Sequence, residues 1–168
     1  MKRLLVFLII TIFNLNTIIA QDFYKIQWSK VEEQEIIGNT KTANKLVEAI
    51  VKKAKEEKND IQFIKSLFYR SKFTMNLEEN SAEVIHDMIS AEINNVDNVS
   101  NSILLSILAD FQSQYLQKNA YRIRDRTNTE NDTSNFQFWS VEKFNSEIIT
   151  NYQKSLKEKE ALKNINIA

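Results

Sequence analysis

The chain lacks the residues on which several classes of fold and site depend. Its 168 residues include no cysteine, no proline and a single glycine. Without cysteine there is no disulfide, no thiolate metal site, no thiol nucleophile and no acylated lipoprotein cysteine. Sheets, barrels and Rossmann folds use glycine and proline at turns, bulges and phosphate-binding loops. The near absence of both residues therefore predicts an all-α protein.

The chain also lacks an excess of charge of either sign, because 22 basic residues balance 22 acidic ones. No global field then favours nucleic acid or an anionic membrane as a partner. The sequence contains neither a glycine-rich phosphate loop nor a metal-ligand spacing, so we expect no cofactor and no metal site.

The N-terminus predicts export. Lys2 and Arg3 precede an apolar run from Leu4 to Phe13, which is shorter than the ~20 residues that a membrane-spanning helix needs. Ala20 before Gln21 suits signal peptidase, so residues 1–20 are interpreted as a cleaved signal peptide. An uncleaved anchor is the alternative. Cleavage removes two cations and no acids, which leaves 20 basic and 22 acidic residues, and predicts a periplasmic or secreted protein without a membrane segment.

The mature chain, residues 21–168, has the periodicity of helices. Residues 42–57 carry apolar side chains at spacings of three and four, and Gly38 suits the end of the preceding helix. Residues 61–77 are apolar on more than one face, which indicates a helix packed between neighbours. Asn80-Ser81 begins a fourth helix, whose inner face is expected to carry Ile85, Met88, Ile89 and Ile93. Asn98 to Ser102 are interpreted as the connection to the fifth.

The fifth and sixth predicted helices complete the pattern. The fifth has a wide apolar stripe that includes Leu104, Leu108 and Tyr115, and Trp139 is expected to open the sixth. Paired off, the helices start near residues 22, 61 and 100, a repeat of about 39 residues. This predicts stacked helical hairpins resembling a tetratricopeptide repeat, with a helical bundle as the alternative. The domain is expected to be the N-terminal part of a larger protein.

No residue in the chain indicates catalysis. His86 is the only histidine and no serine is marked as its partner, so we interpret it as a half-exposed helical side chain. Glutamate groups such as Glu56-Glu57 are interpreted as solvated helix surface rather than acid–base pairs or cation sites. Trp28 and Trp139, each expected to open a helix, are interpreted as core anchors. The protein is not expected to be an enzyme.

The best candidate site is the stretch around Tyr121, Arg122, Arg124 and Arg126. In an extended segment, the three guanidinium groups would project to one side, beside Tyr121, and form a docking patch for acidic groups of a partner domain. The alternative is structural: the arginines cap helix-end carbonyls and pair with Asp125, Asp132 or Glu130. An ordinary polar loop between two helices would look the same.

An ordered set of residues resembles the N-terminal helical region of large secreted bacterial alpha-2-macroglobulin-like proteins. The set runs through Trp28-x-x-Val31, Gly38-x-x-Lys41-x-Ala43, "QFIKSLFYR" (62–70), Ala91-Glu92-Ile93, "ILLSILADFQSQY" (103–115), Tyr121-Arg122-Ile123 with Arg126-Thr127, Trp139 and Tyr152-x-x-Ser155-Leu156. The resemblance covers nearly all of the mature chain, and no single motif in it is decisive.

The resemblance implies a non-catalytic scaffold or docking segment of a protease (endopeptidase) inhibitor. Such inhibitors are built from macroglobulin-like β-sandwich domains, a bait segment and often a thioester between cysteine and glutamine. This chain has no cysteine for a thioester and no region that maps onto the bait or β domains, so no functional residue carries over and we expect a truncated or leading piece. The partner implied is protein: the downstream macroglobulin-like domains or another periplasmic protein. The alternative is a stand-alone periplasmic helical-repeat adaptor that binds a protein or peptide.

Overall fold

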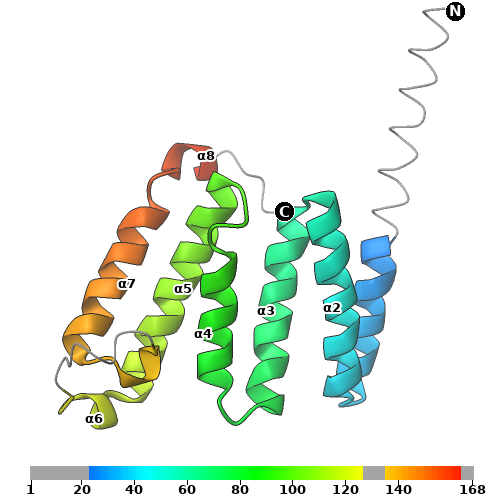
Figure 1. The fold of residues 1–168 in the computed structure, drawn as a ribbon. Coiled ribbons are helices and arrows are strands. Elements are labelled where there is room, and N and C mark those ends of the chain that lie inside the picture. Colours follow the sequence, from blue (N-terminus) through cyan, green and yellow to red (C-terminus); the bar gives the residue numbers. More distant parts are fainter. Residues whose placement is uncertain (1–22, 127–134, 164–168) are drawn as a thin grey trace, which may run out of the picture. The chain divides into compact units, whose positions relative to one another are not determined.

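The structure, a computed structural model, describes residues 23–126 and 135–163 and confirms the all-α prediction (Figure 1). Within these residues every regular element is a helix. The first helix spans residues 23–36. The others are α2 (Thr40–Glu57), α3 (Asp60–Leu77), α4 (Ser81–Glu92), α5 (Asn98–Lys118), α6 (Ala120–Ile123), the 3-10 turn η1 (Phe136–Phe138), α7 (Val141–Ser155) and α8 (Lys159–Lys163).

Backbone contacts divide the chain into two compact units, one ending at Phe73 and the other beginning at Thr74. The boundary falls inside α3, whereas the sequence predicted one helical domain over residues 21–168. The predicted signal peptide, residues 1–20, lies outside the described residues.

Two left-handed residues end the first helices of the first unit. Gly38 has φ +75°, as its position predicted, and its N–H donates to the carbonyl of Glu35 at 3.0 Å. Lys58 ends α2 with φ 53°, and the Asn59 N–H returns to the carbonyl of Ala54. A side chain with a Cβ adopts this conformation at a cost, so the end of α2 is held by its return hydrogen bonds.

Trp28 anchors the packing of the first unit. Its indole Nε1 donates to Gln62 Oε1 at 2.7 Å, and its ring lies 4.7 Å from the ring of Tyr69. Trp28 is buried, as expected of a core anchor, but it lies inside helix 23–36 and does not open it. In α3, Phe63 and Leu67 are buried while Ile61 and Phe68 are exposed. The second apolar face of this helix is therefore open to solvent, although the sequence predicted that neighbours would cover it.

The second unit places α4, α5 and α7 side by side in alternating directions, with α5 in the middle (Figure 1). Leu108 of α5 packs with Ile85 and Ile89 of α4, which confirms the predicted inner faces of both helices. Two predicted boundaries are wrong. Asn98 to Ser102 form the first turn of α5, because the Asp97 carboxylate accepts the N–H groups of Val99 and Ser100 and starts the helix there.

The second boundary error concerns Trp139, which precedes α7 by two residues. The helix begins after Ser140, whose hydroxyl accepts the Lys143 N–H at 3.2 Å. Trp139 is still buried, in a cluster with Ile123, Phe136 and Phe144. Its interpretation as a core anchor is therefore correct, although the helix that it was expected to open starts later.

Candidate functional site

The arginine-rich segment folds into a helical turn. Residues Ala120–Ile123 form α6, and Arg124 continues with right-handed helical angles. The extended geometry that would project Arg122, Arg124 and Arg126 to one side is therefore absent here. Ile123 is fully buried in the aromatic cluster of the second unit, and this apolar contact holds the turn in place.

Arg126 has the structural role that was the alternative to docking. Its Nη1 donates to the carbonyl oxygen of Gln137 in η1 and lies 3.5 Å from the carbonyl oxygen of Trp139. Both carbonyls belong to the segment that leads into α7. One guanidinium thus ties the residues after α6 to the residues before α7, as a cap on backbone carbonyls.

The remaining three candidate residues face solvent. The side chain of Tyr121 is 83% exposed, and the Arg124 guanidinium lies 5.4 Å from the centre of its ring. Arg124 Nε also donates to Asp125 Oδ1 at 3.2 Å, in the pairing that the structural interpretation named. Arg122 is exposed. The other acids proposed as partners, Glu130 and Asp132, lie outside the described residues.

His86 is buried in the second unit, so its interpretation as half-exposed is wrong. Its ring stacks on Phe136 with centroids 4.2 Å apart and planes 9° apart, and meets Trp139 edge-on at 5.6 Å. The segment that covers it comes from η1, some fifty residues further along the chain. No local pattern around His86 could have predicted this cover.

A chain of hydrogen bonds leads from His86 across α5 to α7. The Gln112 side-chain nitrogen lies 3.3 Å from His86 Nε2, and the Asn151 nitrogen donates to Gln112 Oε1 at 3.2 Å. On the other side of the ring, Nδ1 lies 3.1 Å from the exposed carboxylate of Asp87. Gln112 and Asn151 are both buried. Each polar group therefore depends on the next for its partner.

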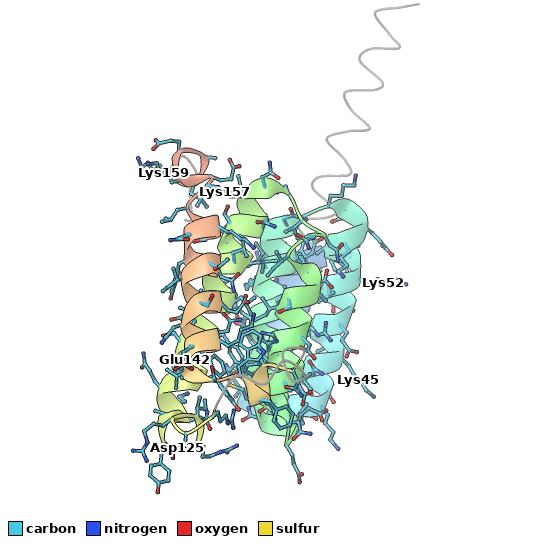
Figure 2. The ribbon with its side chains drawn as sticks, turned by 60° about the vertical axis from the view of Figure 1, so that its left-hand side comes forward. Lys45, Lys52, Asp125, Glu142, Lys157 and Lys159 are labelled. Carbon is cyan, nitrogen blue, oxygen red and sulfur yellow. The ribbon has the colours of Figure 1, made fainter. Side chains whose placement is uncertain are left out.

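Asn151 lines a cavity of about 520 Å³ at one end of the second unit. The cavity lies where α4 ends, α5 begins and α7 ends. Its walls are formed by Ser90, Ile93, Asn94, Asn98, Asn101, Ser102, Leu105, Asn151, Lys154, Lys157 and Glu158. Asp125, beside the arginine-rich segment, and Lys157, at the cavity, lie at opposite ends of this unit (Figure 2). The two candidate sites are therefore separate.

The sequence carried a signal for the cavity that its interpretation missed. Asn98, Asn101 and Ser102 were assigned to a connection, in which polar side chains need no explanation. Once they are placed in the first turn of α5, their spacing of three and four puts them on one helix face. Leu105 continues this face into the core, so the polar residues occupy positions where a core-facing helix is usually apolar.

Glu57, from one of the glutamate groups, is hydrogen-bonded to two side chains. It accepts hydrogen bonds from Lys53 Nζ at 2.9 Å and from the buried Tyr24 hydroxyl at 2.7 Å. The Lys53 and Tyr24 hydrogen bonds lower the pKa of the Glu57 carboxyl, while burial and Glu57 raise the pKa of Tyr24. Glu57 therefore supports the core of the first unit and is more than solvated surface.

A metal cluster and a membrane-spanning helix are both absent from the described residues. These residues contain no group of three or more histidine, aspartate or glutamate side chains placed to hold a metal ion. None of the described helices has the length and apolar character to cross a bilayer. An exposed apolar surface is the remaining kind of candidate site in these residues.

One such surface lies on α7. Ile149, Tyr152 and Leu156 are 56%, 38% and 62% exposed and recur at spacings of three and four. The opposite face of the same helix carries Phe144 and Asn151, which are buried. We call the first set the α7 apolar stripe.

The sequence matches no protein-family model, no curated protein and no solved structure.

Proposed function

We propose that the chain is a non-catalytic docking module of the secretory pathway, and that it forms the N-terminal helical segment of an alpha-2-macroglobulin-like endopeptidase inhibitor. The α7 apolar stripe carries the proposal. Large apolar side chains left in water at helical spacing mark a surface that a partner covers. The partner proposed is the macroglobulin-like part of the same protein.

The energetics of the stripe favour a protein partner. Burying one large aliphatic or aromatic side chain contributes about 1.5–3 kcal/mol, and the three members of the stripe are already partly shielded. They form a small apolar centre, with exposed Asn145 and Gln153 on the same helix as a polar rim. An apolar centre inside a polar rim is the usual composition of a protein interface.

The ordered set of residues that resembles the alpha-2-macroglobulin-like family supports the finer assignment, and the predicted signal peptide agrees with a periplasmic or secreted location. The exposed members of the arginine-rich segment, Tyr121, Arg122 and Arg124, would then provide a second contact to acidic groups of the partner. Exposed charges of this kind speed and orient association more than they strengthen it.

The first test is the genomic DNA downstream of the coding sequence. An in-frame or frameshifted continuation that encodes β-sandwich domains is the expected result. A clean stop followed by an unrelated gene would contradict the family assignment and favour the stand-alone adaptor, for which the cavity at the start of α5 provides a place for a ligand.

The second test uses those β domains as a separate chain. Ile149→Asp with Leu156→Asp should weaken their binding by at least about tenfold, because two charges would be buried without partners. Thr42→Asp with Ala49→Asp is the matched control, since it adds two charges to the exposed surface of α2 in the first unit. Equal affinity of the α7 variant and the control would refute docking through α7.

A further inference from the structure

Mostly polar side chains line the cavity of the second unit, at the ends of three helices that pack together. Its walls include Ser90, Ile93 and Asn94 from the end of α4, Asn98, Asn101, Ser102 and Leu105 from the start of α5, Asn151 and Lys154 on α7, and Lys157 and Glu158 in the turn after α7. The residues from α4, α5 and α7 recur at spacings of three, four or seven, so each set lies on one face of its helix. Further along the same helices, Leu108 of α5 packs against Ile85 and Ile89 of α4 in an apolar cluster.

This polar end reduces the stability of the unit. An open cavity forfeits packing contacts, and amides held between helices lose part of their hydration. Leucine or isoleucine at the same positions would close the gap and extend the core. Departures from packing rules of this kind concentrate at functional sites.

The orientation of two amides is fixed by the protein. Asn151 is 6% exposed and its nitrogen donates to Gln112, so the side-chain oxygen is the part of the amide left to accept a hydrogen bond. The Asn101 nitrogen donates to the carbonyl oxygen of Ile93 at 2.6 Å, so the side-chain oxygen of Asn101 is likewise the accepting part of its amide. The cavity thus offers two pre-oriented acceptors, which favour a ligand carrying N–H groups.

The other polar groups complete a recognisable pattern. Asn94 and Asn98 are exposed and provide both donors and acceptors. Lys154 and Lys157 provide cationic donors, and with the acidic Glu158 they leave one net positive charge in the lining. A peptide backbone presents N–H and C=O groups in alternation, and a free carboxylate ends it with a negative charge. None of the described lining residues is aromatic, so the platform on which sugars or nucleobases stack is missing.

We infer that the cavity binds the carboxyl-terminal end of a peptide chain. Asn101 and Asn151 accept hydrogen bonds from backbone N–H groups, Asn94 and Asn98 pair with the backbone next to them, and Lys154 and Lys157 hold the terminal carboxylate. A volume of about 520 Å³ lies within the range of small-ligand sites and suits a few residues rather than a folded element. The apolar contacts available are Ile93 and Leu105.

This inference does not rest on the proposed function. The cavity-lining residues of α7 and the α7 apolar stripe lie on opposite faces of the helix, and the arginine-rich segment lies at the other end of the unit. A variant that disrupts one site should leave binding at the other intact, so either proposal can be refuted without the other.

The experiment titrates the mature chain, residues 21–168, with the acetylated tripeptide acetyl-Ala-Ala-Ala as the probe. One form has a free carboxylate and the other a terminal amide. Backbone NMR shifts locate the binding, and calorimetry measures the affinity. The expected result is shifts confined to residues 90–105 and 151–158, with the free carboxylate bound at least about tenfold more tightly, as the loss of a charge-assisted hydrogen bond implies.

The variants separate the parts of the site. Lys154→Gln with Lys157→Gln should remove the preference for the carboxylate and leave the far-UV spectrum unchanged, because both lysines are exposed. Lys118→Gln with Arg122→Gln, both exposed and at the other end of the unit, is the control for net charge. Asn98→Leu should weaken both peptides without changing their ratio.

Three results would overturn the inference. One is the absence of shifts around the cavity at millimolar peptide. The second is inorganic phosphate binding as tightly as the carboxylate peptide, which would define a simple anion site. The third is a monosaccharide producing the cavity shifts while the peptides produce none.

Discussion

Replacing Arg126 with glutamine gives the sharpest test of how the arginine-rich segment works. Arg126 donates to the carbonyl of Gln137 and approaches that of Trp139, so the variant removes the tie between the residues after α6 and the residues before α7. Arg122→Gln is the matched control, because Arg122 is exposed. The two variants change charge equally and differ in what the guanidinium contacts.

The magnitude follows from those contacts. A hydrogen bond to a charged group contributes about 1.5–3 kcal/mol. The Trp139 oxygen, at 3.5 Å, is at the limit of bonding, and Arg126 is partly exposed, so the lower end applies. A loss of about 1.5 kcal/mol lowers Tm by roughly 3–6 °C in a chain of this size. Surface substitutions such as Arg122→Gln usually stay within about 0.5 kcal/mol.

The assay is thermal unfolding of each variant without any partner, followed by circular dichroism. The indole signal of Trp139 in an NMR spectrum reports the local change, because the backbone of this residue lies next to Arg126. Equal melting temperatures for Arg126→Gln and Arg122→Gln would refute the structural role. Arg126 would then be assigned again to the docking patch, with Tyr121, Arg122 and Arg124.

Four further predictions concern the rest of the chain. Leu108→Ala should cost on the order of 2–5 kcal/mol in denaturant unfolding, because it opens a cavity against α4; an effect below that of a surface change would contradict the buried stripe. Tyr24→Phe should raise the pKa of Glu57 in an NMR titration, since it removes a hydrogen bond to the carboxylate, and an unchanged pKa would show that Lys53 alone lowers it. Because folding lowers this pKa, the contribution of Glu57 to stability is present above its unfolded pKa of about 4.3 and is lost as the pH falls through the folded value. Lys58→Gly should stabilise the chain by up to about 1 kcal/mol in chemical unfolding by relieving the left-handed cap, and a loss would contradict that strain. N-terminal sequencing of exported protein should begin at Gln21, and a retained leader in the membrane fraction would contradict cleavage.

Most of the fold could be predicted because the information is local. Apolar spacing predicted the inner faces of α4 and α5, and the only glycine marked the turn before α2. The helix starts were misplaced where a capping side chain decided them. Asp97 and Ser140 cap the starts of α5 and α7, and apolar spacing alone does not mark a capping residue.

The candidate site could be predicted only in part, because its contacts are distant in sequence. Arg126 meets carbonyls more than ten residues away, and His86 is covered by Phe136 from another part of the chain. The cavity joins the ends of three helices, and no pattern within one helix indicates which ends meet. Helix periodicity fixes the face on which Asn151 lies, and only the packing of α5 against α7 fixes what it contacts.

The hydrogen-bond chain that begins at His86 has a direction. The Gln112 nitrogen lies 3.3 Å from His86 Nε2, and the Gln112 oxygen accepts from Asn151. A carboxamide has one donating end and one accepting end, so the orientation of Gln112 dictates that of Asn151. A Gln112 amide turned over would require Asn151 to turn with it, and the cavity would then face a nitrogen in place of an oxygen. The hydrogen-bonding preference of the cavity wall is thus fixed two side chains away, among the aromatic rings.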